Sequence, residues 1–473
     1  MQTNHEKVVA ELTSRWPENR VAPSLDRIRA VLELLGDPQR TCPVIQITGT
    51  NGKGSTAIMI ESLLRAAGLR TGRYSSPHLV DVTERIAIDG QPISRERFGE
   101  VWADVKPYVE IVDEQLLDGV RMTFFEVLTA MAYAAFADAP VDVAIVEVGL
   151  GGTWDATNVA DAQVAVVMPI DLDHTHLLGT TLTEIATEKA GIIKPGAHAI
   201  LAGQDLEAAT VLLRHCADVG ALVQREGVDF GLLDRSLAVG GQLIRLNGAE
   251  GPVEDIHLPL HGVHMARNAG VALAAVEAFL GMKALPADLI REGLGEVSAP
   301  GRLEVIRQSP PIVLEGAHNP HAAAAAAEAV SEAYAFDPLI GVLAMMRDKD
   351  VEAVLRVWEP LMAEVICTRV ESTDRGLPPG ELAEQAAEVF GPDRVRRADS
   401  LADALELATT LADTDAGQPG VLVTGSVIAA GEARALLAGD DLARDADEID
   451  WDAEDHGGTI DELGADHEHA EDD

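Results

Sequence analysis

The sequence is poor in cysteine and basic residues, and it has no long apolar run. Its three cysteines, Cys42, Cys216 and Cys367, have neither a metal-binding spacing nor an obvious disulfide scheme. No stretch of about 18 uncharged apolar residues occurs. The opening MQTNHEKVVAELTSRW lacks the apolar segment of a signal peptide. We therefore expect a cytoplasmic protein in a reducing compartment, without a membrane span.

The scarcity of positive charge argues against nucleic acid as a partner. Lysine and arginine total 36 against 78 acidic residues, which gives a formal net charge of -42. A nucleic-acid-binding surface needs a basic footprint. The acidity is densest at 439–473, which we interpret as a disordered tail. An anionic ligand must therefore be held by local cations, backbone amides or metal.

Helix-like and strand-like runs alternate along the chain, which predicts an α/β protein with a mostly parallel sheet. A turn-rich patch at 222–260 predicts a small antiparallel sheet. Pro and Gly interrupt the pattern at 298–302, after which the alternation resumes. The expected strands are 43–48, 142–149, 162–170 and 198–203, and the expected helices between them include 54–67 and 123–137. We predict domains at 1–299 and 300–438, followed by the tail at 439–473.

A glycine-rich turn, GTNGKGST at 49–56, lies between an apolar run and a helix-like run. Strand, turn and helix in this order are the context of a phosphate-binding loop, whose backbone amides point at the anion. Lys53 would neutralise phosphate charge, and the hydroxyl of Ser55 or Thr56 could reach a magnesium ion. The fit to the common G-x-x-x-x-G-K-[ST] pattern is imperfect, because residue 47 is Ile. A purely structural turn is the alternative.

The loop TGTNGKGS resembles that of the Mur ligase superfamily, in its folylpolyglutamate synthase/dihydrofolate synthase branch. Further matching segments follow in the family's order over residues 20–436. They are GRYSSPHLVDVTERI (72–86), TFFEVLTAMAY (123–133), EVGLGGTWDATN (147–158), DLDHTHLLG (171–179), EKAGIIKPG (188–196), APGRLE (299–304), EGAHNP (315–320), MMRDKD (345–350) and GVLVTGS (420–426). The resemblance implies a large N-terminal P-loop ATPase domain with a mostly parallel sheet. A smaller C-terminal Rossmann-like α/β domain should follow it.

The same resemblance implies ATP-dependent amide formation. A carboxylate takes the γ-phosphoryl group of ATP, and the amine of L-glutamate attacks the resulting acyl phosphate. Positioning and cations supply most of the catalysis in such transfers. The implied cofactors are ATP, two Mg²⁺ ions and a monovalent cation. The implied substrates are L-glutamate with dihydropteroate or reduced folate, and the choice between these acceptors stays open.

The family's nucleotide-binding and catalytic residues map onto both predicted domains. The implied ATP-binding residues are Asn51, Gly52, Lys53, Gly54, Ser55, Thr56, Asn268, Arg302 and Glu315. The implied catalytic residues are Lys53, Lys189 and His318. Glu315 stands where the family usually has Asp, and Thr153 stands where Arg is common. Arg302 would reach phosphate when the domains close, and an interdomain salt bridge is its alternative role.

The metal ligands implied by the family are Ser76, Glu147 and His174. Glu147 ends a strand-like run, where open α/β sheets place ligand groups, and hard cations prefer oxygen ligands. Ser75 rivals Ser76, and Asp173 and His176 flank His174. The family carries a carbamylated lysine, N6-carboxylysine, at the position of Lys189. The alternative is a surface lysine that pairs with Glu184 or Glu188.

For the pterin substrate the resemblance points to two segments and to an opening helix at 22–36. The segments contribute Thr123, Phe124, Phe125, Glu126, Trp154, Asp155 and Ala156, and the helix contributes Asp26 and Arg27. Phenylalanines at the head of an apolar helix are alternatively core residues. We expect the glutamate pocket between the domains, near His318 and the RDKD sequence.

Two other functions compete with this one. A Mur-type peptidoglycan ligase would usually have an extra N-terminal domain, for which the chain before Gly49 is too short. A P-loop ATPase or binding module without ligase activity would not need a second α/β domain with its own carboxylate and histidine. We expect a monomer.

Overall fold

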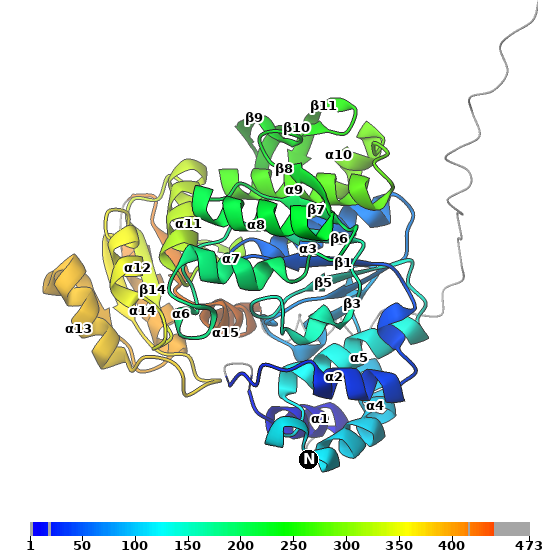
Figure 1. Cartoon of the computed structure of the whole chain (residues 1–473). Coiled ribbons are helices and arrows are strands. Elements are labelled where there is room, and N and C mark those ends of the chain that lie inside the picture. The colour runs from blue at the N-terminus through cyan, green and yellow to red at the C-terminus, as the bar shows by residue number, and fades with distance from the viewer. Residues whose placement is uncertain (1–2, 18–19, 415–416, 439–473) are drawn as a thin grey trace, which may run out of the picture.

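The computed structural model describes residues 3–17, 20–414 and 417–438, arranged around three β-sheets (Figure 1). The predicted acidic tail, 439–473, lies outside the described residues. A sheet of eight strands and a sheet of six strands form the two large α/β layers. The predicted α/β architecture is therefore confirmed. No helix in the described part of the chain is long and apolar enough to cross a bilayer.

The first sheet has the strand order β4-β3-β2-β5-β1-β6-β7-β8. Its strands are β1 (Val44–Thr48), β2 (Thr71–Tyr74), β3 (Ile86–Ile88), β4 (Gln91–Pro92), β5 (Val143–Glu147), β6 (Val164–Val167), β7 (His198–Leu201) and β8 (Leu222–Arg225). The neighbouring strands β2, β5, β1, β6, β7 and β8 pair in parallel, and β3 and β4 add an antiparallel edge next to β2. Every residue of β1 and β5 is buried, as expected for parallel strands covered on both faces.

Helices cover both faces of this sheet. Ile45 and Ile47 of β1 pack into the layer of α3 (Lys53–Ala66), α9 (Val263–Phe279) and α10 (Ala287–Gly295). The opposite face packs on two groups of helices. They are α1 (Asn4–Thr13), α2 (Asp26–Leu34), α4 (Arg95–Gln115) and α5 (Phe124–Asp138), and then α7 (Leu182–Ala190) and α8 (Leu206–Val219). Figure 1 shows the first group gathered at one end of the molecule.

The predicted antiparallel sheet is confirmed in part. Strands β9 (Gly231–Ala238), β10 (Gly241–Gly248) and β11 (Gly251–Leu258) form an antiparallel sheet of three. Residues 222–225 belong instead to β8, which pairs in parallel with β7. Helix α8 connects β7 to β8, and such a crossover returns the chain parallel to the strand it left.

The six-stranded sheet has the order β12-β13-β17-β14-β15-β16. Its strands are β12 (Arg302–Gln308), β13 (Pro311–Glu315), β14 (Leu339–Leu343), β15 (Glu364–Cys367), β16 (Val395–Arg397) and β17 (Gly420–Thr424). Helices α11 (Pro320–Ala333), α12 (Val351–Trp358), α13 (Pro379–Phe390), α14 (Leu401–Thr414) and α15 (Val427–Ala438) connect or follow them. The sequence at 298–302 was predicted only as a break, yet it leads directly into β12, which carries Arg302.

Candidate active site

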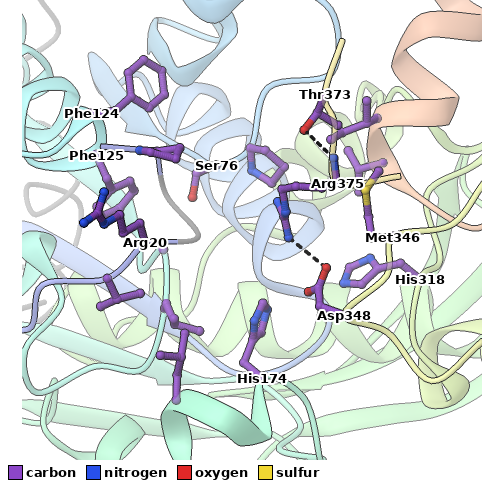
Figure 2. A pocket seen from close by; sticks show the side chains of 18 of the residues that line it. Arg20, Ser76, Phe124, Phe125, His174, His318, Met346, Asp348, Thr373 and Arg375 are labelled. Atoms are coloured by element: carbon purple, nitrogen blue, oxygen red, sulfur yellow. Dashed lines mark hydrogen bonds and ion pairs between the residues drawn. The ribbon is translucent and has the colours of Figure 1, made fainter. Parts of the chain in front are cut away.

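A cavity of about 990 Å³ lies between the two α/β units and is lined by loops and helices of both. On one side it contacts the phosphate loop and the loops that follow β2, β5 and β6. On the other side it contacts His318 and the loops after β14 and β15. Figure 2 shows Ser76, Phe124 and His174 facing this space opposite His318, Asp348 and Arg375. The cavity therefore forms where the carboxyl ends of parallel strands open toward the second unit.

The phosphate loop follows β1 and leads into α3, as the strand–turn–helix prediction required. Gly49 has φ +142°, and a Cβ atom there would lie 2.5 Å from the Met168 side chain, so only glycine fits. Lys53 is the first residue of α3, and its Nζ donates to the carbonyl oxygens of Gly49 at 3.1 Å and Thr50 at 3.3 Å. The lysine thus lies over the loop, beside the amides at the helix N-terminus that suit an anion.

Ser55, Thr56 and Asn268 lie around this loop rather than on the cavity wall. Ser55 and Thr56 are buried, and Thr56 Oγ1 donates to Met168 Sδ at 3.4 Å. Asn268 is buried in α9, and a Cβ on Gly52 would lie 3.2 Å from its amide atoms. The structure therefore brings Asn268 onto the loop across more than 200 residues of sequence.

Ser76 and Glu147 meet at the ends of β2 and β5. The Ser76 N–H donates to Glu147 Oε2 at 3.3 Å, and that oxygen would lie 3.5 Å from a Cβ on Gly54 in the phosphate loop. Burial raises the pKa of the Glu147 carboxyl above its ordinary value. Within the described residues Glu147 forms no ion pair, so a bound cation would compensate its buried charge. The rival, Ser75, instead accepts a hydrogen bond from Arg73 Nη1 at 2.9 Å.

His174 lies on the same cavity, after β6. It precedes the short helix α6 (Thr175–Leu178) with φ +50°, and its side chain is 34% exposed. Burial and the neighbouring Lys349 ammonium lower the pKa of His174 to about 4. A neutral imidazole is the form that binds metal. Ser76 and Glu147 offer oxygen donors and His174 offers a nitrogen donor to a divalent cation, although no cluster of three His, Cys, Asp or Glu side chains occurs in the described ranges.

Lys189 points into the protein. Its side chain is buried in α7, lines the cavity, and donates from Nζ to the Gly49 carbonyl oxygen at 2.9 Å. Burial, together with the like charge of Lys53, lowers the pKa of Lys189 to about 7. The alternative of a surface lysine paired with Glu184 or Glu188 is wrong, because the side chain turns inward to the phosphate loop.

The predicted pterin segments form one end of the cavity. Thr123, Phe124, Phe125, Glu126, Trp154, Asp155 and Ala156 all line it. Phe124 also belongs to the core, with 7% of its surface exposed, so its alternative role as a core residue is confirmed and its pterin contact stays a prediction. Burial raises the pKa of Asp155 to about 6, although its carboxylate accepts hydrogen bonds from Thr157 and from the Leu150 N–H. Thr153, where the family often has Arg, turns away and donates to the Glu188 carbonyl.

The expectation that Asp26 and Arg27 line the substrate site is corrected. Neither residue lies on the cavity wall. Arg27 is fully buried, and its guanidinium binds Glu126 Oε1 at 3.0 Å and Asp118 Oδ2 at 3.1 Å. A buried arginine needs such partners, and its effect on the cavity passes through Glu126.

Arg302 and Glu315 lie side by side on β12 and β13. Arg302 Nη1 is 3.8 Å from Glu315 Oε1, so the interdomain salt bridge considered for Arg302 is wrong. Glu315 is buried, and its carboxylate accepts the N–H groups of Leu303 and Ala317, each at 3.0 Å. Burial raises the pKa of Glu315, and Arg302 opposes that rise. The carboxylate of Glu315, one methylene farther from the backbone than that of the family's usual Asp, therefore contacts groups of its own unit.

Several functional candidates were not predicted from the sequence. Asp173 was considered only as a neighbour of His174, yet it accepts from Lys349 Nζ at 2.6 Å and Asn319 Nδ2 at 3.1 Å. Arg375 reaches the cavity and binds Asp348 Oδ1 at 3.1 Å (Figure 2). In the sequence, Asp348 and Lys349 stood out only as members of RDKD. Nothing in the local spacing predicts that Lys349 contacts Asp173.

A phosphate loop in one α/β unit that faces a second α/β unit across a shared cavity agrees with the Mur ligase class, and the comparisons with known proteins show that class. The Mur ligase middle domain matches residues 47–276, and the Mur ligase glutamate ligase domain matches residues 301–427. Dihydrofolate synthase/folylpolyglutamate synthase of Mycobacterium tuberculosis is 47% identical over 91% of this chain and 93% of that protein. The Escherichia coli protein of the same name is 35% identical over 85% and 88% of the two chains. This chain belongs to the folylpolyglutamate synthase/dihydrofolate synthase family.

Solved structures agree with this assignment. Mycobacterium tuberculosis folylpolyglutamate synthase complexed with ADP and AMPPCP superimposes with a TM-score of 0.88 at 46% identity, over 92% of this chain and 99% of that one. Escherichia coli FolC in complex with DHPP and ADP gives a TM-score of 0.80 at 31% identity, over 93% and 99%. The Mur-ligase-like fold predicted from the sequence is confirmed.

Proposed function

We propose that this chain joins L-glutamate to the carboxylate of dihydropteroate and of reduced folates, at the expense of ATP. The observation that carries the proposal is a single cavity that contacts Lys53 of the phosphate loop, the aromatic and carboxylate wall at 123–126, and His318 of the second unit. ATP, the acceptor and L-glutamate must meet in such a ligation. The phosphate loop suits ATP, the wall at 123–126 suits the acceptor, and the wall of the second unit suits glutamate. Family membership supports the same reaction.

In the proposed reaction the acceptor carboxylate oxygen attacks the γ-phosphorus of ATP and ADP leaves. The glutamate nitrogen then attacks the acyl carbon, loses a proton and expels inorganic phosphate. Lys53 and the amides of the phosphate loop hold the triphosphate, while Phe124 and Asp155 orient the flat heterocycle. When bound, Mg²⁺ supplies charge neutralisation at the phosphates, and Ser76, Glu147 and His174 are the residues that would hold it.

Lys189 is proposed to be carbamylated. Its amine must be neutral to add carbon dioxide, and a pKa of about 7 leaves a large neutral fraction at neutral pH. The addition forms an N–C bond and releases a proton, so a buried cation becomes an anion. An anion beside the phosphate loop would favour a cation there and would remove the repulsion between Lys189 and Lys53.

L-glutamate is proposed to bind on the wall formed by the second unit. Its carboxylates need cations, and Lys349, Arg347 and Arg375 line the cavity there beside His318. The proposed domain boundary between residues 299 and 300, the monomeric state and the cytoplasmic location stay predictions. Transfer of glutamate distinguishes this proposal from an ATPase without ligase activity.

A phosphate-release assay with ATP and Mg²⁺ tests the proposal. Reactions contain L-glutamate with either dihydropteroate or tetrahydrofolate, and omission controls lack glutamate or the acceptor. Glutamate-dependent phosphate release with dihydropteroate and also with tetrahydrofolate supports both ligase activities. Glutamate-dependent release with only one of these two compounds identifies that compound as the acceptor. Release independent of glutamate would contradict the ligase assignment.

A further inference from the structure

A pair of asparagine amides joins the phosphate loop to the second unit. Asn319 Nδ2 donates to Asn51 Oδ1 at 3.0 Å, and Asn51 Nδ2 donates to Asn319 Oδ1 at 3.4 Å. Asn51 Nδ2 also lies 2.9 Å from His321 Nδ1. The side chain of Asn51, predicted to bind ATP, is therefore directed at the loop and helix that follow β13.

Asn319 also contacts a half-buried ion pair between Asp173 and Lys349. Asn319 Nδ2 also donates to Asp173 Oδ2 at 3.1 Å, and Asp173 Oδ1 accepts from Lys349 Nζ at 2.6 Å. The side chains of Asp173 and Lys349 are 12% and 8% exposed, and Asn319 is 4% exposed. Asn51 and Asp173 follow two strands of the first sheet, whereas Asn319 and Lys349 follow two strands of the second.

This geometry fixes the relative position of the two units, which is here called their docking register. Leaving a buried or half-buried amide or charge without a partner costs free energy, because the group has lost water and gained nothing in return. In the observed arrangement each of these groups is paired, and a shift of either unit would break several pairs together. His318 precedes Asn319 directly, so the register also fixes where His318 and Lys349 stand relative to Lys53.

We propose that Asn51, Asp173 and Asn319 are positioning residues for the ligation step. They hold the second unit at one distance and orientation over the phosphate loop, and the side chain of Asn51 acts through Asn319 rather than as a nucleotide ligand. The proposal rests on the proposed function, in which the second unit brings glutamate to an acyl phosphate formed on the first. An attack across two units is sensitive to displacements of about 1 Å.

The test compares Asn51→Ala, Asn319→Ser and the double variant with wild type, in the full chain. Serine at 319 can still cap α11, where Asn319 Oδ1 accepts from the Ala322 N–H at 2.9 Å. We expect the ligation kcat at saturating substrates to fall about tenfold in each single variant, as for one or two lost hydrogen bonds. We expect the ADP affinity, measured by calorimetry, to stay within about twofold. The loss of kcat in the double variant should be clearly smaller than the product of the two single losses, because both substitutions break the shared Asn51–Asn319 contact.

A matched control is the ion pair between Arg235 on β9 and Glu332 on α11, which also joins the two units but does not line the cavity. Glu332→Ala should leave the ligation kcat unchanged. If Asn51→Ala does not fold, Asn51→Ser takes its place in the comparison. Parallel losses of ADP affinity and kcat, multiplicative effects in the double variant, or an equal loss in Glu332→Ala would each overturn the proposal. Absence of glutamate-dependent phosphate release in wild type would instead refute the proposed function.

Discussion

Replacement of Lys53 by alanine should separate catalysis from folding. Lys53 Nζ makes two hydrogen bonds to loop carbonyls, which are worth about 1 kcal/mol each when fully formed. One term opposes this loss, because Lys53 is the first residue of α3, where the helix dipole disfavours a cation by about 0.3–1 kcal/mol. The free energy of unfolding should therefore fall by no more than about 2 kcal/mol.

The effect on turnover should be much larger. A preorganised charge aimed at the transferring phosphoryl group is worth about 10²–10³ in rate, and this loss applies to kcat at saturating ATP. The assay is glutamate-dependent phosphate release, paired with urea unfolding of the same preparation. The exposed Lys283 provides a control, since Lys283→Ala should change neither quantity. Turnover of Lys53→Ala within about twofold of wild type, together with cooperative unfolding, would refute the phosphate-loop assignment.

Three further substitutions probe the site. Glu315→Asp should withdraw the carboxylate from Arg302 and the Leu303 N–H and raise the KM for ATP about fivefold; an unchanged KM would remove Glu315 from the nucleotide site. Lys189→Ala should lower kcat at least about 100-fold, and acetate should restore part of it by replacing the carbamate; equal activity with and without acetate would contradict carbamylation. Asp155→Asn should flatten the pH dependence of stability. The pKa of Asp155 rises from 3.8 to about 6 on folding. The contribution of its protonated carboxyl to the free energy of unfolding is therefore fully present below pH 3.8 and is lost as the pH rises through 6. That change amounts to about 3 kcal/mol in wild type, measured by urea unfolding between pH 4 and 7, and an unaltered slope in the variant would rule out this role.

Local pattern was sufficient to predict the phosphate loop and the strands that carry it. The apolar run before Gly49 is a buried strand because both faces of a parallel sheet are covered, and the helix that follows begins at Lys53. Motif order then placed Ser76, Glu147, His174 and Lys189 around one site. The structure brings Ser76 and Glu147 into contact and turns Lys189 inward.

Long-range pairing could not be predicted from spacing. The resemblance of residues 22–36 to the family's first helix suggested a substrate contact for Arg27, but its partners Glu126 and Asp118 lie about 90 or more residues away in the sequence, and the side chain is buried. Asn51 and Asn319 are 268 residues apart, and their contact exists only because two separately built sheets dock. The strand β8 was also missed, since its four residues carry no turn signal that separates them from the antiparallel strands after them.

The most direct test of the account is the mass of the product. Purified full-length protein is incubated with ATP, Mg²⁺, L-glutamate and dihydropteroate, or with tetrahydrofolate in place of dihydropteroate, and the acceptor is analysed by mass spectrometry. The account predicts an acceptor heavier by one glutamyl residue, formed only when ATP is present, with one ADP per addition. ADP formation with an unmodified acceptor would contradict it.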